Sequence, residues 1–287
     1  MTRVAEAAAG VTVVIATRNR RRRLLATLER LRELDERPPV VVVDNASTDG
    51  TANAVHAWAD VVRLPRDIGP AARTVGVERA RTPLVAFCDD DSWWAPDALT
   101  RAAAVFAAYP RLGLLAARIV VEPRGDLDPT CEAMRDSPIE APFPLPGPAV
   151  LGFVACAAVA RRSAILECGG FDGRYGFGGE EQLLAADLMA AGWGLAYVDD
   201  VVAHHQPAKG PRAWRDTRTL RNQLWFAWLR RPLPQALRTT LALATAGDGN
   251  ARSALTAALR GLPWVLRERR PVPPHVERRL RRLEDAG

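Results

Sequence analysis

The chain has 287 residues, of which 48% are hydrophobic and 25% are charged. A chain of this length and composition can bury a large core, which excludes a disordered protein and favours one large domain, alone or with an appendage. The net charge of +6 is unevenly distributed: residues 1–207 carry 22 basic and 27 acidic residues, and residues 208–287 carry 17 and 6. The positive charge therefore belongs to the C-terminal part.

The cysteines and the apolar runs indicate the compartment. The four cysteines have no metal-binding spacing, and Cys88 and Cys156 lie in apolar runs, so we expect free core thiols in a reducing cytoplasm. The N-terminus has no apolar leader, and the longest apolar run, residues 149–160, is too short to span a bilayer. A soluble cytoplasmic protein is the expectation.

Four apolar runs within the first ninety residues have the length and composition of buried strands. They cover residues 11–16, 40–43, 61–64 and 84–87. Helical stretches separate them, with apolar residues at helical spacing in the first connection. This alternation predicts an α/β fold in which helices cover both faces of a parallel sheet.

Polar residues follow the first two strands, at the carboxyl ends where ligands collect in open α/β sheets. Asp44 could accept a ring N–H from a nucleobase, or it could serve the turn alone. Arg20–Arg23 begin the first helix, where the helix dipole disfavours cations. These arginines either meet a phosphate or are merely solvated.

Three consecutive carboxylates, Asp89, Asp90 and Asp91, follow the fourth strand. If the chain stays extended there, Asp89 and Asp91 point the same way and Asp90 points oppositely. One Mg²⁺ or Mn²⁺ could then join the like-facing pair and take phosphate oxygens as further ligands. The alternative is a solvated acidic turn that caps the next helix.

Further candidates lie in the second half of the domain. Residues 122–148 are rich in Pro, Gly and Asp, which is typical of a lid or binding loop, or of a poorly ordered segment. Glu180 and Glu181 begin a helix, where acids also have a purely structural role. His204 and His205 follow a short strand, so only one of them can face a site.

The C-terminal region combines apolar stripes with arginines. We predict that residues 208–287 form a basic helical region packed on a domain of residues 1–207. Its stripes could dock on that domain, on a partner or on a lipid surface. The basic charge could meet an anionic membrane, or the arginines could simply reflect a compositional bias, and nucleic acid is not expected.

Four stretches together resemble the family 2 glycosyltransferases of the GT-A fold, in the order and spacing of that family. They are residues 13–20, 43–51, 87–92 and 169–181, and the resemblance extends from residue 11 to about 207. It implies a Rossmann-like nucleotide-diphospho-sugar transferase with a mostly parallel central sheet and a helical C-terminal appendage. The QxxRW stretch of processive polysaccharide synthases is absent, so a non-processive bacterial enzyme is implied.

The resemblance also implies roles for individual residues. Asp44 would contact the base, and Asp91 with Asp89 would bind Mn²⁺ or Mg²⁺, completed by His205 or His204. Glu181 would be the catalytic base, with Glu180 as its neighbour. The donor site would consist of Ala16, Thr17, Arg18, Asp44, Asp67, Arg73, Asp89 and Asp90. This chain departs from the family pattern at Thr74, where Asn is common, and at Glu181, where Asp is more usual.

The function implied is metal-dependent, inverting transfer of a sugar from a UDP- or dTDP-sugar to an unknown hydroxyl acceptor, in the cytoplasm or at the inner face of the cell membrane. One alternative is a nucleotidyltransferase, but that class favours an early basic glycine-rich loop, and the single lysine here is Lys209. Another is an inactive scaffold that presents the basic tail to RNA or membrane. Acids at all three strand ends argue against it. The sequence names neither sugar, acceptor nor oligomeric state.

Overall fold

The computed structural model describes residues 10–207, 213–246 and 249–286. Among these residues, nine strands form one sheet in the order β3-β2-β1-β4-β8-β6-β9-β5, with β7 paired to β6. The strands are β1 (Val11–Thr17), β2 (Val40–Asp44), β3 (Asp60–Arg63), β4 (Leu84–Cys88), β5 (Ser92–Trp94), β6 (Leu112–Val121), β7 (Asp126–Leu127), β8 (Ala158–Arg161) and β9 (Gly194–His205).

The sheet has a parallel half and a mixed half. Strands β1 to β4 are parallel to one another, as the alternation of strands and helices predicts. Strand β8 runs antiparallel to both β4 and β6, and β9 runs parallel to β6. The α/β class is therefore confirmed, and the direction of β8 could not be read from a single apolar run.

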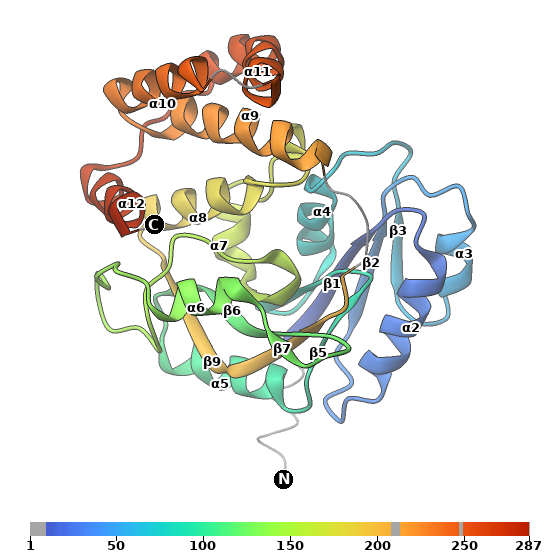
Figure 1. Cartoon of the computed structure of the whole chain (residues 1–287). Helices are drawn as coiled ribbons and strands as arrows, with labels where there is room; N and C mark the ends of the chain where they lie inside the picture. Colours follow the sequence, from blue (N-terminus) through green and yellow to red (C-terminus); the bar gives the residue numbers. More distant parts are fainter. Residues whose placement is uncertain (1–9, 208–212, 247–248, 287) are drawn as a thin grey trace.

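Helices surround the sheet of the first domain (Figure 1). Helix α4 packs on β1 and β2, and α5 and α8 pack on β9. A Cβ added to Gly76 of α4 would lie 2.3 Å from the Val14 side chain, so glycine permits this close approach. The helices are α2 (Arg21–Arg32), α3 (Thr51–Val55), α4 (Ala71–Arg79), α5 (Ala98–Ala108), α6 (Pro129–Arg135), α7 (Arg162–Glu167) and α8 (Glu180–Ala190), with short 3₁₀ turns at Ala155–Ala157 and Gly173–Tyr175.

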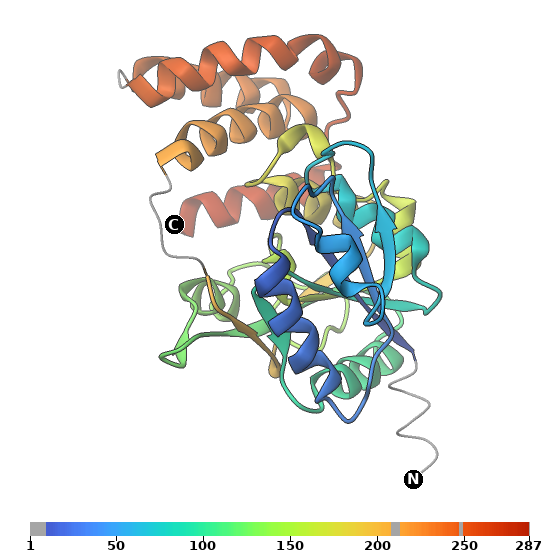
Figure 2. The ribbon, with the colours of Figure 1, turned by 90° about the vertical axis from the view of Figure 1, so that its right-hand side faces the viewer.

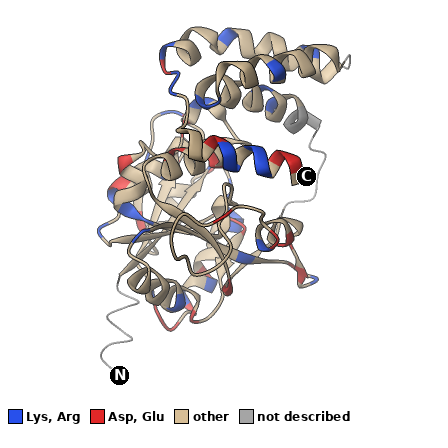
Figure 3. Ribbon diagram, turned by 90° about the vertical axis from the view of Figure 1, so that its left-hand side faces the viewer, with Lys and Arg blue, Asp and Glu red and all other residues tan. Residues whose placement is uncertain are grey.

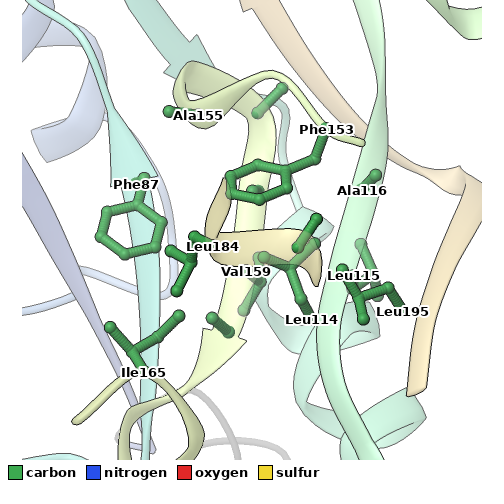
Figure 4. Close-up of a cluster of buried hydrophobic side chains, with 14 of the residues drawn as sticks. Phe87, Leu114, Leu115, Ala116, Phe153, Ala155, Val159, Ile165, Leu184 and Leu195 are labelled. Atoms are coloured by element: carbon green, nitrogen blue, oxygen red, sulfur yellow. The ribbon is translucent and has the colours of Figure 1, made fainter. Parts of the chain in front are cut away.

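The core includes buried residues of the sheet, of α2 and α5, and of α7 and α8, and one part of it lies between the sheet and these last two helices. Phe87 of β4 and Val159 of β8 pack there with Leu184 of α8 (Figure 4). All four cysteines are free, and Cys88, Cys131 and Cys156 are buried, which confirms that these three are core thiols. This packed layer fixes the strand ends that carry the polar residues.

Residues 122–148, expected to be irregular, contain strand β7 and helix α6. The Asp128 side chain accepts a hydrogen bond from the Thr130 backbone N–H at 2.9 Å and caps α6. The segment is therefore partly helical, and its role as a lid or binding loop stays a prediction.

The C-terminal region consists of α9 (Ala213–Arg230), α10 (Leu233–Thr245), α11 (Gly249–Arg267) and α12 (Pro274–Ala286). Helix α9 lies between the first domain and the outer pair α10 and α11, and α12 lies beside α8 (Figures 1 and 2). The predicted domain boundary at residues 207 and 208 adjoins residues outside the described ranges, so it stays a prediction. No helix in the described part of the chain has the length and apolarity needed to cross a membrane.

Candidate active site

The ends of β1 and β2 form one wall of the site. The Asn45 backbone N–H donates to the Thr17 carbonyl at 2.9 Å, which holds the two strand ends together. Asp44 is buried, and its Oδ1 accepts a hydrogen bond from the Ser47 N–H at 3.0 Å. The Asp44 side chain also lines a cavity of about 170 Å³ with Thr51 and Arg63. Asp44 thus serves the turn and also lines a cavity, and its contact with a nucleobase stays a prediction.

Loops after three strands meet beside this wall. Arg18, in the loop after β1, forms an ion pair with Asp67, in the loop after β3. Asn45, after β2, donates from its Nδ2 to Asp67 Oδ1 at 2.8 Å. The structure therefore brings the predicted donor residues Arg18, Asp44 and Asp67 together, and Ala16 and Thr17 lie at the end of β1 next to them.

The acidic triplet lies in a turn rather than in a strand. Strand β4 ends at Cys88, and the Ser92 N–H donates to the Asp89 carbonyl at 3.3 Å to close the turn before β5. The extended geometry that we expected for Asp89 and Asp91 is therefore wrong. Asp90 points back to β1, where its Oδ2 accepts from the Thr17 hydroxyl at 2.8 Å. Burial raises the pKa of Asp90 to about 6.

Asp91 lies between an arginine and a histidine. Its Oδ2 is 2.8 Å from Arg23 Nη1, and its Oδ1 is 3.6 Å from His205 Nε2. Burial alone would raise the pKa of Asp91, but the hydrogen bond and charge of His205 and the charge of Arg23 lower it below its ordinary value. Arg23 is thus paired with Asp91 and not merely solvated.

The two adjacent histidines have different surroundings. Strand β9 pairs with β5 in a register that sets His205 opposite Ser92, next to Asp91. The His204 ring stacks on Trp93, and its Nδ1 lies 2.9 Å from Glu122 Oε1. Of the two, His205 contacts the acidic turn, and His204 serves the packing of the sheet.

The residues at the acidic turn fit a divalent cation that takes only some of its ligands from the protein. The described residues contain no group of three or more His, Cys, Asp and Glu that could hold a metal. Asp91 supplies one carboxylate, a ligand type that suits Mn²⁺ and Mg²⁺, and His205 supplies one imidazole beside it. Mg²⁺ and related ions in nucleotide sites take one or two protein carboxylates and complete their shell with phosphate oxygens and water. Two protein ligands are compatible with that arrangement.

Arg73 connects the acidic turn to the acidic pair at the start of α8. Its side chain is 5% exposed, with Nη2 at 2.8 Å from Asp89 Oδ1 and Nη1 at 3.8 Å from Glu180 Oε1. Burial alone would lower the pKa of Arg73, but the charges of Asp89, Glu181 and Glu180 raise it. Its Nε and Nη1 have no hydrogen-bond partner among the described residues, so a buried cation there has donors available for an anionic ligand.

A glycine-rich loop sets the positions of Glu180 and Glu181. Gly178 and Gly179 have φ values of 99° and 95°, a conformation that favours glycine, and α8 begins directly after them. Glu180 is buried, and its Oε2 accepts from the Gly178 N–H at 2.6 Å. Asn222 of α9 donates to the Gly178 carbonyl. Glu181 is only half-buried, so it is the more accessible acid.

Thr74, which replaces a common Asn, holds the chain just before this loop. Its hydroxyl accepts a hydrogen bond from the Phe171 N–H at 2.8 Å. A Cβ on Gly170, whose φ is 73°, would lie 2.3 Å from that hydroxyl. The departure from the family pattern is thus compatible with a structural link between α4 and the segment before α8.

The ionisation of Glu180 gives a testable effect on stability. Burial, and then the neighbouring charge of Glu181, raises the pKa of Glu180 above its ordinary value. A raised pKa in the folded state gives stability that is fully present below the unfolded pKa and is lost as the pH rises through the folded pKa. The variant Glu180→Gln has no carboxyl group that ionises at this position, so it does not lose stability in this way. We therefore compare the free energy of unfolding of Glu180→Gln with that of wild type at two pH values. The variant minus wild-type difference should rise by on the order of 1–2 kcal/mol between about pH 5 and about pH 9. Denaturant unfolding measures it. A pH-independent difference would contradict this description of Glu180.

Comparison with known proteins supports the fold and identifies related sequences. Residues 12–169 match the family model described as glycosyl transferase family 2. A pre-mycofactocin glycosyltransferase of Mycobacterium tuberculosis is 34% identical over 223 residues, which cover 71% of this chain and 44% of the relative. The chain therefore spans less than half the length of this curated relative.

Solved structures with similar folds share lower sequence identity. Mannosyltransferase PcManGT from Pyrobaculum calidifontis, in complex with GDP-Man and Mn²⁺, is 23% identical with a TM-score of 0.61, covering 96% of this chain and 86% of that chain. S. aureus TarS 1-349, in complex with UDP-GlcNAc, is 17% identical with a TM-score of 0.57, covering 96% of this chain and 90% of that chain. These similarities confirm the GT-A fold predicted from the sequence.

Proposed function

The chain belongs to glycosyltransferase family 2, and from that premise we propose that it moves a sugar from a nucleoside-diphosphate sugar to a hydroxyl acceptor with inversion at the anomeric carbon. The observation that carries the proposal is Arg73, a buried cation that pairs with Asp89 of the acidic turn and with Glu180, the neighbour of Glu181 on α8. It places residues suited to a diphosphate next to residues suited to proton transfer.

The donor would lie across the strand ends. Asp44 would accept a ring N–H of the base, because its buried carboxylate lines the cavity at the end of β2. Arg73 would bind the diphosphate through Nε and Nη1, which make no hydrogen bond to a described residue. Asp91 and His205 would hold Mn²⁺ or Mg²⁺, with Asp89 in support. A bound divalent cation supplies electrostatic stabilisation of the charge on the departing diphosphate.

The acceptor would be activated by Glu181. Its carboxylate begins α8, where the helix dipole favours the ionised form, and it is the more accessible of the two acids. Glu181 would take the proton of the acceptor hydroxyl as that oxygen bonds to the anomeric carbon and the carbon–oxygen bond to the diphosphate breaks. Attack opposite the leaving group inverts the anomeric centre. Because the relative from Mycobacterium tuberculosis is a pre-mycofactocin glycosyltransferase, pre-mycofactocin is one acceptor to test.

Base recognition by Asp44 can be tested separately. If Asp44 accepts the ring N–H of uracil or thymine, Asp44→Asn should weaken UDP or dTDP binding by about 1–3 kcal/mol, the range for disturbing a buried hydrogen bond to a charged group. Isothermal titration calorimetry with UDP, dTDP, ADP and GDP measures this. Equal affinity of the wild-type protein for purine and pyrimidine diphosphates would count against pyrimidine recognition by Asp44.

A further inference from the structure

The outer pair of helices, α10 and α11, exposes an unusual share of the apolar side chains. Among the described residues, six large hydrophobic side chains are exposed, and five of them lie on these two helices. They are Leu233 (51%), Leu237 (52%) and Leu241 (65%) on α10, and Leu259 (65%) and Leu266 (49%) on α11. We name this surface, with the arginines described below, the hairpin face.

The leucines occupy the flanks that do not pack on the protein. On α10, Leu233, Leu237 and Leu241 are four residues apart and share one side of the helix. On α11, Trp264 packs on Trp225 and lies under Arg174 of the first domain. At 100° per residue, Leu259 and Leu266 lie on the opposite flank of α11 from Trp264, so they face away from the first domain.

The charges of the hairpin face all have one sign. Its arginines are Arg238, Arg252, Arg260 and Arg267, all exposed, and neither α10 nor α11 contains an Asp or Glu. Figure 3 shows the contrast with α12, which carries both signs.

The arginines around α12 are used inside the protein. Glu277 and Glu284 of α12 bind the buried Arg231, which follows α9. Arg282 pairs with Glu140 of the first domain, and Arg281 pairs with Glu277. The final helix looks like the most basic part of the tail in sequence, but in the structure its charges secure its packing. On the hairpin face, Arg267 pairs with Glu268, which follows α11, whereas Arg238, Arg252 and Arg260 form no ion pair among the described residues.

We propose that the hairpin face docks on the surface of an anionic lipid bilayer. Apolar side chains that enter the headgroup boundary, beside arginines that meet anionic lipids, are what holds an amphipathic helix in the plane of a membrane. A second copy of the chain is a poor occupant, because a two-fold contact would set these arginines against the same arginines with no acid between them. A protein hot spot would favour Trp, Tyr and Arg over Leu, whereas every large apolar side chain here is Leu.

Docking of the hairpin face would bring the candidate site close to the membrane. Helix α9 packs on α11 on one side, and its Asn222 holds the Gly178 carbonyl on the other. Two helix layers, α11 and α9, each about 10 Å thick, thus separate the hairpin face from the loop that precedes Glu180 and Glu181. If the proposed sugar transfer is correct, acceptors that extend from the membrane surface would be within reach.

Sedimentation of the full chain with lipid vesicles tests this proposal. We expect binding to phosphatidylcholine vesicles with about 30% phosphatidylglycerol, weak binding to pure phosphatidylcholine, and loss of binding as salt is raised. Leu237→Gln with Leu241→Gln should weaken binding on the order of tenfold. Arg238→Gln with Arg260→Gln should weaken it about 25-fold, since each arginine near the surface contributes about fivefold.

Two controls make the result specific. Arg101→Gln with Arg278→Gln removes the same charge from exposed positions outside the hairpin face and should bind like wild type. The arginine variants remove no buried side chain, so they test the surface even if the leucine variant unfolds. Equal binding by all variants, or binding independent of anionic lipid, would overturn the proposal. The proposal would also be overturned if the wild-type protein formed a dimer, bound no vesicles, and lost the dimer in the leucine variant. No donor is present, so failure of the proposed sugar transfer would leave this result unaffected.

Discussion

Replacement of Asp91 by Asn is expected to lower donor turnover by roughly 10³-fold or more, because one carboxylate ligand of the cation is lost while the shape of the side chain is kept. Asp91 is the acid that lies next to His205, and its pKa is held below the ordinary value, so it is ionised and ready to bind a cation at neutral pH. The variant should also weaken Mn²⁺-dependent binding of the nucleoside diphosphate. Release of the diphosphate and calorimetric titration give the two measurements.

Asp97→Asn is the matched control for this change. Asp97 is an exposed acid a few residues further along, with φ at 62°, a conformation that Asn tolerates. It should leave turnover and Mn²⁺-dependent binding unchanged. Full activity of Asp91→Asn, or of wild type in excess chelator, would exclude the metal role of Asp91.

Glu181→Gln is expected to lower the acceptor-dependent rate roughly 10²- to 10⁴-fold with little change in nucleotide affinity. The amide keeps the size of the carboxylate and its hydrogen bonding but cannot take a proton from the acceptor. Steady-state transfer rates at saturating donor, together with the dissociation constant of the diphosphate, separate these effects.

The neighbouring acid provides the comparison. Glu180 is buried with a raised pKa, so its protonated form resembles Gln in shape and charge. Glu180→Gln should therefore reduce transfer less than Glu181→Gln. Wild-type transfer by Glu181→Gln would show that another group accepts the proton. A parallel loss of nucleotide binding would place Glu181 in the donor site or the fold instead.

Local patterns in the sequence were sufficient to predict these helices and strands and the polar residues at the ends of the strands. The β-branched run at Val11 and the valines at 40–43 predict β1 and β2, and Asp44 lies at the end of β2 as expected. Helical spacing of Leu24, Leu28 and Leu31 likewise predicts α2, where all three are buried. These features depend on period and side-chain shape, which each segment carries by itself.

The contacts within the site depend on how distant segments are placed, and the sequence did not reveal them. The expectation that Asp89 and Asp91 point the same way assumed an extended chain. It is wrong because β4 ends at Cys88, one residue before Asp89, and the chain then turns. Arg23 meets Asp91 across 68 residues, and the position of α2 over the acidic turn decides that contact. Basic residues at a helix start, where the helix dipole disfavours them, are the signal in the sequence for such a contact, but they do not identify its partner.

The sequence likewise did not reveal that the leucines of α10 and α11 are exposed. Leucines at helical spacing indicate a packed face, and Leu224 of α9 is indeed buried. On α10 and α11 the same spacing produces the hairpin face, because α9 and the first domain cover other sides of these helices. Which face is covered follows from the arrangement of helices and not from their periodicity.

The central claim is most directly tested by the release of nucleoside diphosphate from a panel of UDP-, dTDP- and GDP-sugars, by the wild-type protein and Glu181→Gln, with Mn²⁺ and with excess chelator. The account predicts that one donor class is turned over by wild type in the presence of Mn²⁺, that chelator abolishes this turnover, and that acceptor stimulates wild type but not Glu181→Gln. Turnover that survives chelation, or acceptor stimulation that Glu181→Gln retains in full, would contradict it.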